Sequence, residues 1–314
     1  MSRRLSTLLR LVVAIGIAAF VLYQSNPADA FTALRQVSPA WLGGAAVLVI
    51  ADRALMAYRW MALLGSGDRP PFGRMLRIFF ESSFVGAFLP SVGGDVARAW
   101  KLAHDGVSGS RSVASVLMDR LLGVISILMS GAVGIALAPA VFDRSVLIVS
   151  VGLLSLACAA ALLLVFSRTA DRLAKASLVW VPSAWVARSL HRLLDALQAY
   201  RHQSRALVLV LGASVVVQVL RVAQAWMLGR GLAMTVPFEV YLAYIPIILL
   251  VMMLPITVSG IGTGNLAFVF LFTQAGVPAS SAFALSVLFL LLGVAGMLPG
   301  GVLYALPRRA VETR

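Results

Sequence analysis

The sequence has few of the residues that keep a folded protein soluble. Only 12% of its 314 residues are charged, whereas 61% are hydrophobic. A soluble domain is about 45–50% apolar and about 25% charged. The excess apolar surface needs lipid as its solvent, so we predict an integral membrane protein that spans the bilayer several times and is not a soluble enzyme.

Cysteine and histidine are also scarce, and their placement excludes several classes of site. The lone Cys158 lies in an apolar run, so it forms no internal disulfide and we interpret it as a packing residue. The three histidines lie outside the apolar runs and lack the spacing of metal ligands. There is no phosphate-binding loop and no nucleophile elbow. The sequence therefore predicts no metal, no cofactor and no catalytic residue of a common enzyme class.

Basic residues are the one plentiful charged class, and they give a net charge of +14. They lie between apolar runs without a basic-aromatic motif, so we exclude nucleic acid as a partner. They gather at both termini and in residues 65–112 and 168–205, whereas 25–39, 139–144 and 229–239 hold one arginine each. Because cytoplasmic loops collect Lys and Arg, we predict a multi-pass protein of the cytoplasmic (inner) membrane with both termini in the cytoplasm.

Apolar runs of the length that crosses a bilayer, about 20 residues, define the membrane segments. They occur at 5–24, 40–64, 113–138, 145–167, 205–228 and 279–305. The first run resembles a signal peptide that precedes a cleavage site at Ala28-Asp29-Ala30, but we interpret it as a retained helix because the rest of the chain is polytopic. Residues 76–103 and 238–275 are apolar but interrupted by Pro and Gly.

The basic loops constrain the two interrupted segments. Residues 76–103 begin and end beside cytoplasmic loops, which predicts a re-entrant hairpin; residues 238–275 are either a hairpin from outside or two full spans. We therefore predict one all-α membrane bundle over 1–314, with six to eight membrane segments. The cytoplasmic loop 168–205 carries leucines on one helical face, which indicates a helix on the membrane surface; the alternative is a solvated linker. These leucines are Leu190, Leu193, Leu194 and Leu197.

Ionisable residues inside apolar segments cost about 2.5–3.5 kcal/mol each on insertion scales, so they mark a pathway or a paired structural site. This chain has Asp52, Arg53, Arg59, Glu81, Asp119, Arg120 and Arg221 in such segments. Helical spacing places some of them on polar stripes. One stripe is Ser115, Asp119, Gly123, Ser126 and Ser130, and the other is Ser214, Gln218, Arg221 and Gln224. We interpret the stripes as facing a wet cavity, and the alternative is salt-bridged contacts between helices.

Both interrupted segments contain Leu-Pro followed by a Gly-rich stretch and a polar residue. The first runs from Leu89-Pro90 to Gly93-Gly94-Asp95, and the second from Leu254-Pro255 to Gly260-Ile261-Gly262-Thr263-Gly264-Asn265. Pro ends a helix, and we expect Asp95 and Asn265 to cap the helices that follow. Two broken helices in corresponding halves point to a transporter binding site, where helix N-termini favour an anion such as phosphate. The alternative is a pair of ordinary loops.

Several of these elements also match a known family in their order and spacing over nearly the whole chain. They are Arg59-Trp60 with Leu63-Leu64, the Phe88-to-Arg98 segment with Gly93-Gly94-Asp95, Ser115 to Asp119-Arg120, Pro255 to Gly262, and Leu298-Pro299-Gly300-Gly301. On these residues the chain resembles the membrane region of lysylphosphatidylglycerol synthase/flippase proteins and their stand-alone relatives. The family often has Arg-Glu where this chain has Gly264-Asn265, so one carboxylate is missing here.

The resemblance implies a lipid flippase or lipid-binding transporter that moves a charged-headgroup lipid between leaflets, with Asp95, Arg98, Asp119 and Arg120 as functional residues. We hypothesise that Arg98, Arg120 and Arg221 hold the phosphate of an anionic lipid. The full candidate binding set is Asp52, Arg59, Glu81, Gly93, Gly94, Asp95, Arg98, Asp119, Arg120, Arg221, Gly260, Gly262 and Asn265. The alternatives are a lipid-modifying enzyme, a subunit that presents lipid to a separate transferase, and a scaffold; a homo-oligomer is also open. The sequence does not include the aminoacyl-transferase domain of those synthases, so we do not expect lysyl transfer by this chain alone.

Overall fold

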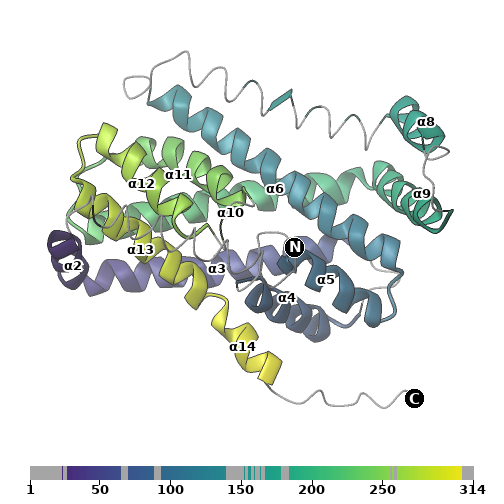
Figure 1. Ribbon diagram of the computed structural model, residues 1–314, viewed down its shortest axis with the longest axis horizontal. Helices are drawn as coiled ribbons and strands as arrows, with labels where there is room; N and C mark the ends of the chain where they lie inside the picture. Colours follow the sequence, from purple (N-terminus) through teal and green to yellow (C-terminus); the bar gives the residue numbers. More distant parts are fainter. Residues whose placement is uncertain are drawn as a thin grey trace.

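The structure, a computed structural model, describes most of the chain. The described residues are 27–64, 70–87, 93–138, 167–177, 184–254 and 260–305, together with Tyr23, Gly152, Ser155, Leu156, Ala159, Leu163 and Thr257. Within these residues the regular elements are helices (Figure 1), which confirms the all-α prediction. The predicted spans 5–24 and 145–167 lie almost wholly outside the described residues, so the count of six spans stays a prediction.

Four helical segments are long and apolar enough to cross a membrane. They are α3 (Pro39–Leu63), α6 (Gly109–Leu137), α10 (Ser204–Gly231) and α13 (Ala279–Ala295), which α14 (Leu298–Ala305) prolongs. The shortest has 25 residues, about 38 Å at 1.5 Å per residue, which exceeds the bilayer's hydrocarbon core of about 30 Å. Each coincides with an apolar run of the sequence, so these four predictions are confirmed.

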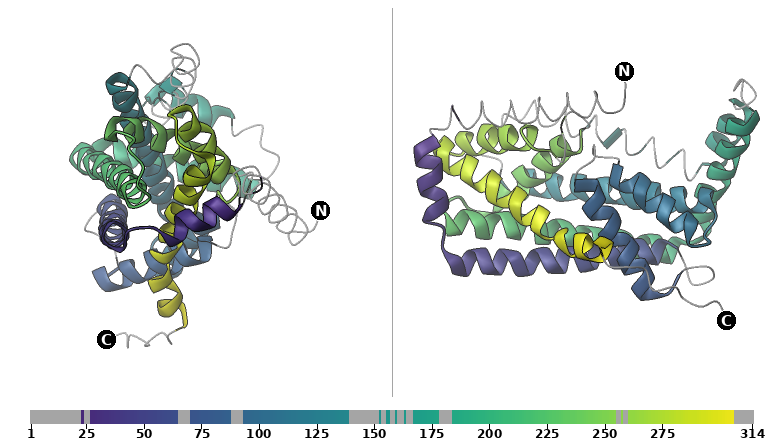
Figure 2. Two further views of the ribbon diagram at one scale, coloured as in Figure 1. Left: turned by 90° about the vertical axis from the view of Figure 1, so that its left-hand side faces the viewer. Right: turned by 60° about the horizontal axis from the view of Figure 1, so that its bottom comes forward.

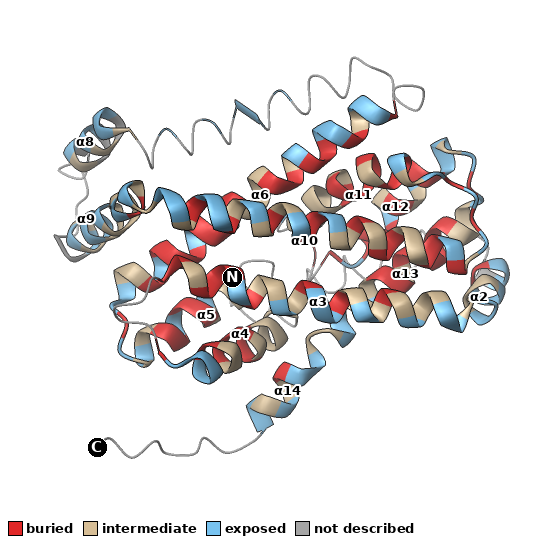
Figure 3. Ribbon diagram, turned by 180° about the vertical axis from the view of Figure 1, so that it is seen from behind, coloured by how far each residue is buried: buried red, intermediate tan, exposed pale blue. Residues whose placement is uncertain are grey.

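The outer surface of these helices is apolar. Buried and exposed stretches alternate along the ribbon of these helices, so each has a covered side and an uncovered side (Figure 3). Ile50 on α3 and Val208 on α10 are 69% and 72% exposed. A surface that exposes such large hydrophobic side chains suits contact with lipid acyl chains rather than water.

Each interrupted segment forms a pair of shorter helices. The first pair is α4 (Phe72–Ala87) with α5 (Gly93–His104), and the second is α11 (Phe238–Met253) with α12 (Thr263–Gln274). In each pair the first helix has 16 residues and the second has 12. A 16-residue helix extends about 24 Å, less than the hydrocarbon core. The break at 88–92 lies outside the described residues.

Both helix pairs turn back to the end of the bundle from which they start. Arg111 near the start of α6 donates a hydrogen bond to the carbonyl oxygen of Leu64, which follows α3 (3.0 Å). The end of α3 and the start of α6 therefore lie at the same end of the bundle, and the α4–α5 pair that connects them starts and finishes there. Gly231 of α10 and Ser280 of α13 line one hollow, so α11 and α12 start and finish together at the other end. This arrangement fits both interpretations of 238–275, a hairpin and two full spans, so the choice between them and the depth of both segments in a bilayer stay predictions.

The two hairpins belong to two corresponding halves of opposite orientation. Each half has a long helix, a 16-residue helix, a 12-residue helix and another long segment, and α3 and α10 pack side by side. The Ser38 amide before α3 donates to the carbonyl oxygen of Gly231 at the end of α10 (3.0 Å), so these helices are antiparallel (Figure 2). The chain therefore forms an inverted repeat, an architecture found in many transporters.

Equivalent close approaches hold the halves together. Helix α6 packs on α11 in one place, and α14 packs on α4 in the other. A Cβ atom on Gly134 would overlap the backbone of Leu242 and Ala243, and one on Gly300 would overlap the backbone carbonyl of Phe80. Only glycine allows backbones to approach so closely, so these two residues set the position of each hairpin against the opposite long helix.

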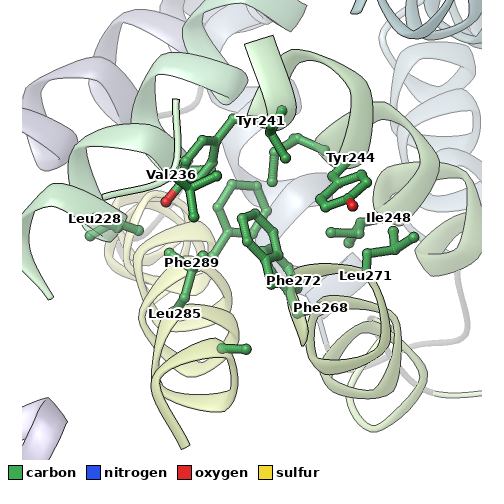
Figure 4. Packing of buried hydrophobic residues seen from close by; sticks show 14 of the residues in the cluster. Leu228, Val236, Tyr241, Tyr244, Ile248, Phe268, Leu271, Phe272, Leu285 and Phe289 are labelled. Atoms are coloured by element: carbon green, nitrogen blue, oxygen red, sulfur yellow. The ribbon is translucent and has the colours of Figure 1, made fainter. Parts of the chain in front are cut away.

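An aromatic core fixes the second hairpin to α13 (Figure 4). Phe268 and Phe272 lie one turn apart on α12 and stack with ring centroids 5.9 Å apart. Tyr244 of α11 meets the Phe272 ring edge-on at 5.4 Å, and Phe289 of α13 meets Phe268 at 5.4 Å. Such contacts, together with burial of the rings, hold α11, α12 and α13 together.

Outside the two halves lie the helices α2 (Pro27–Arg35), α8 (Arg168–Ser177) and α9 (Ala184–Ala199). The amphipathic helix predicted in 168–205 is present as α9, but Leu193 and Leu197 pack on α6 beside Met118. Part of its apolar face therefore covers the bundle, while Leu190 remains exposed. Lys175 joins α8 to α9 because it contacts Asp171 and Asp195, and its hydrogen bonds to these carboxylates raise the pKa of Lys175.

Candidate functional site

A cavity of about 350 Å³ lies between the two halves. The tips of both hairpins line it, with Gly86 and Gly94 from the first and Met252 from the second. Helices α3, α6, α10 and α13 supply the remaining walls. The charged lining residues are Arg53, Arg98, Arg120, Arg221, Asp52 and Asp95. A hollow of this size with a few converging charged groups in apolar walls is typical of a ligand site.

On one side of the cavity, Asp52 of α3 is shared by two arginines. Its Oδ1 lies 3.0 Å from Arg221 Nε of α10, and its Oδ2 lies 3.7 Å from Arg53 Nε. Arg53 also donates to the backbone carbonyl of Gly293 on α13 at 3.3 Å. Asp52 is buried, so its charge is balanced by these arginines rather than by water.

Asp119 of α6, which lies behind the opposite wall of the cavity, also pairs with two arginines. Its Oδ1 lies 2.7 Å from Arg59 Nε of α3, and its Oδ2 lies 3.6 Å from a terminal guanidinium nitrogen of Arg98 on α5. The Arg98 guanidinium also lies over the rings of Phe79 and Trp60, 4.8 and 5.3 Å from their centroids. Arg59 and Asp119 are not among the lining residues, so they position Arg98 from outside the cavity.

The third pair is Asp95 of α5 with Arg120 of α6, 2.8 Å apart between Oδ2 and Nε. Their side chains are 21% and 35% exposed, which makes this the most accessible ion pair of the cavity. The prediction that Asp95 caps α5 is wrong, because the helix already begins at Gly93 and Asp95 lies within its first turn. The carboxylate therefore reaches across to α6. Position 94 favours glycine, because a Cβ atom there would lie only 3.1 Å from the Cα atom of Gly86 on α4.

The arginines around the cavity outnumber the aspartates. Among the described residues, five arginines (Arg53, Arg59, Arg98, Arg120 and Arg221) face three aspartates (Asp52, Asp95 and Asp119), which leaves two surplus positive charges. In the part of the chain that the structure describes, the Nε atoms of Arg53 and Arg98 are buried without a hydrogen-bond partner. Buried donors of this kind call for an acceptor, and the surplus positive charge favours an anion as that acceptor.

Glu81 lies away from the cavity and has a structural role. It accepts hydrogen bonds from Lys101 of α5 and, at 2.6 Å, from Arg77 Nε on its own helix. Arg77 also donates to the Leu303 carbonyl oxygen of α14 at 2.8 Å. Glu81 therefore holds α5 and α14 to α4, and the structure does not place it among the lining residues predicted for the site.

The predicted residues of the second break also lie outside the cavity lining. Helix α12 begins at Thr263 rather than at Asn265, whose Oδ1 accepts from the Gly262 amide (2.9 Å) and whose Nδ2 donates to Ser286 Oγ (2.6 Å). Asn265 thus caps the helix from inside its first turn. Gly260 and Gly262 have φ of 74° and 85°, a left-handed conformation that favours glycine. These residues shape the tip of the second hairpin. Gly93 likewise lies outside the cavity lining and begins α5.

The two polar stripes face each other inside the bundle, whereas the prediction was that they face a wet cavity; of their residues, Arg221 and Gln224 line the cavity. Gln218 Nε2 donates to Ser126 Oγ at 3.2 Å, and an Arg59 nitrogen donates to Ser214 Oγ at 3.0 Å. The alternative interpretation, salt-bridged contacts between helices, also holds for Arg59 with Asp119. Of the predicted site residues, the cavity brings together Asp52, Gly94, Asp95, Arg98, Arg120 and Arg221.

The candidate set drawn from the sequence omitted Arg53 and the methionines of the cavity. Arg53 carried a signal, because it is an arginine in an apolar segment beside Asp52. Met56, Met252 and Met297 carried none, since a methionine in a membrane helix resembles any other apolar residue. Their flexible side chains suit a cavity wall that adapts to a ligand.

An apolar groove of about 290 Å³ adjoins the charged cavity. The two hollows share Val49 and Arg53. The groove is otherwise lined by apolar residues and glycine, namely Ala46, Ile50, Phe80, Leu292, Ala295, Gly296 and Pro299. Because Ile50 belongs to the exposed apolar surface, the arginine-rich cavity continues into a groove on the lipid-facing side of α3 and α13.

Comparison with known protein families gives a match over nearly the whole chain. The family model described as the lysylphosphatidylglycerol synthase TM region matches residues 7–300. A search of curated proteins finds no match. The family match agrees with the spanning helices and identifies the chain as a membrane protein with a role connected to membrane lipids.

Proposed function

We propose that this chain, which belongs to the family of lysylphosphatidylglycerol synthase TM regions, binds a lipid with an anionic phosphate headgroup and moves it between leaflets. The observation that carries the proposal is the arginine-rich cavity that continues into an apolar groove. A headgroup in the cavity and an acyl chain in the groove would match the two surfaces with the two parts of an amphiphile. We place the protein in the cytoplasmic membrane with both termini in the cytoplasm, from its basic loops.

The charged half of the site supports phosphate recognition. Arginine presents a planar fork of donors that fits phosphate oxygens, and four arginines line this cavity. Arg98 and Arg120 come from opposite sides of the α5–α6 contact, and Arg221 comes from the second half of the chain. A headgroup held by all three would connect the two halves.

The inverted halves support movement rather than static binding. In many transporters the substrate site lies where two inverted repeats meet at broken helices, and the repeats rock around it. Here the last turn of α4 and the first turn of α5 reach the cavity from one side, and the last turn of α11 reaches it from the other. Rocking of one hairpin against the other would expose the headgroup to each side of the membrane in turn.

The test is translocation of a lipid with a fluorescent headgroup label in proteoliposomes. Wild-type protein should make the inner-leaflet lipid accessible to a membrane-impermeant quencher, and Arg120→Ala and Arg221→Ala should abolish this. The pair of Arg120 with Asp95 is partly exposed, so Arg120→Ala should stay folded and carries the test even if Arg221→Ala, which removes the near partner of buried Asp52, is destabilised. Arg205→Ala is the matched control, because Arg205 is exposed in the first turn of α10. Unchanged translocation by both cavity variants would refute the proposal.

The family description also names a synthase, which favours a second candidate function. The chain would then present its lipid to a separate transferase instead of moving it across the membrane. Purified protein that binds the lipid but translocates none, and converts none without a partner, would support this candidate. Conversion of a labelled lipid by the purified chain alone would show a lipid-modifying enzyme.

A further inference from the structure

Two of the cavity arginines have no carboxylate of their own. At Asp52, Arg221 occupies the near position at 3.0 Å and Arg53 the far position at 3.7 Å. At Asp119, Arg59 is near at 2.7 Å and Arg98 is far at 3.6 Å. The near arginine neutralises each aspartate, so Arg53 and Arg98 carry the two surplus charges.

The same two arginines have hydrogen-bonding capacity to spare. Among the described residues, Arg53 Nε and Arg98 Nε are buried and have no hydrogen-bond partner, and both side chains line the cavity. The Arg98 guanidinium is held between Asp119 and the rings of Phe79 and Trp60, so it is in place before a ligand arrives. Arg53 is fixed by the carbonyl oxygen of Gly293. Two preorganised donors from α3 and α5 therefore meet in one hollow.

Resting on the lipid-binding function proposed above, we infer that the cavity selects a phosphate monoester headgroup over a phosphodiester. A surplus of two positive charges in a low-dielectric site is neutralised by a ligand with two negative charges. A phosphate monoester carries about 1.5–2 negative charges at pH 7 and offers three terminal oxygens, whereas a phosphodiester carries one charge. A zwitterionic headgroup would leave the surplus in place.

The first experiment compares two lipids with the same acyl chains, of which one is a phosphate monoester and the other a phosphodiester. Full-length protein in nanodiscs of zwitterionic lipid is titrated with short-chain phosphatidic acid, a monoester, and with phosphatidylglycerol of the same chains, a diester. At pH 8 we expect the monoester to bind at least about tenfold more tightly. At pH 5 the preference should shrink, because the second ionisation of a phosphate monoester lies near pH 6.

The diester serves as the control for the protein's own charges in that comparison. The charged groups that face the ligand are Arg53 and Asp52 of α3, Arg98 and Asp95 of α5, Arg120 of α6 and Arg221 of α10. The arginines keep their charge at both pH values. Any change in the aspartates would alter diester binding as well, so only a change confined to the monoester supports the inference.

Two substitutions then assign the preference to particular residues. Arg53→Gln and Arg98→Gln should each weaken monoester binding about tenfold to a hundredfold, as expected for loss of a charged hydrogen bond, and bring the two lipids closer in affinity. Arg205→Gln makes the same change of charge at an exposed position and should leave the preference intact. The wild-type comparison needs no variant, so it tests the inference even if Arg98→Gln fails to fold.

The outcomes separate this inference from the function on which it rests. Equal affinity of the two lipids at pH 8 would overturn the monoester preference and leave the lipid-binding function standing. Absence of specific binding by either lipid would overturn both. Inorganic phosphate is the third probe: competition as effective as that of the lipid would support the doubly charged ligand but refute a lipid as its source.

Discussion

Neutralising Asp119 should destabilise the protein strongly, because this buried carboxylate lies between two arginines. Its side chain is only 7% exposed and holds Arg59 and Arg98 at once. Asparagine has the same shape, so Asp119→Asn removes charge without removing volume. The substitution raises the surplus around the cavity from two positive charges to three.

The expected loss is about 3–5 kcal/mol, the usual effect of removing one partner from a buried ion pair. The hydrogen bond from Arg59 Nε at 2.7 Å accounts for about 1.5–3 kcal/mol of it. The rest comes from the buried charges that remain. Arg59→Gln combined with Asp119→Asn removes the near pair together, so the double variant should be less destabilised than the sum of the two single variants.

The assay is unfolding by SDS in mixed micelles, followed by tryptophan fluorescence. Trp60 reports on this region because its Nε1 donates to Ser115 Oγ, one turn before Asp119 (3.3 Å). The control is Asp105→Asn, which breaks an exposed pair with Arg74 and should cost no more than about 1 kcal/mol. If Asp119→Asn unfolds at the same SDS fraction as Asp105→Asn, the account of a buried, shared carboxylate is wrong.

Three further predictions use the same unfolding assay. Gly300→Leu should cost about 1–3 kcal/mol or more, because any side chain there meets the backbone of α4; Gly43→Leu, at a glycine with open space around it, should cost little. Phe272→Ala should cost about 3–5 kcal/mol by opening the aromatic core, whereas Phe270→Ala, at a position 61% exposed, should change stability far less. Asn265→Leu should cost about 1–3 kcal/mol, since the Gly262 amide and Ser286 lose their partner; a wild-type midpoint would show that this cap is dispensable.

The helices of the bundle were predictable because a bilayer imposes strict local requirements. A span needs about 20 apolar residues, and α3, α6, α10 and the segment formed by α13 and α14 each begin and end within a few residues of such a run. Pro and Gly marked the second hairpin for the same kind of reason, since φ of 74° at Gly260 suits glycine and few other residues. The cap at Asn265 was placed on the correct residue but at the wrong position, because the helix starts two residues earlier.

The ion pairs show where local reasoning ends. Asp52 and Arg59 share a face of α3, which suggests a common site, yet Asp52 pairs with Arg221 of α10 and Arg59 with Asp119 of α6. Glu81 has the same sequence signature as these residues but only joins α4 to its neighbours. Which charged residues meet depends on how helices far apart in the chain pack, and helical spacing does not contain that information.

The sequence by itself determined that this chain is a helical membrane protein, where its long helices lie and which segments carry polar groups, because each of these follows from hydropathy and backbone chemistry within one segment. The tertiary structure decided which arginines line the cavity and which are neutralised behind it. It also decided that Arg53 and Arg98 keep unused donors, and that an apolar groove adjoins them. The physical reason is that charge balance and cavity shape are properties of several helices packed together, and no single segment carries them.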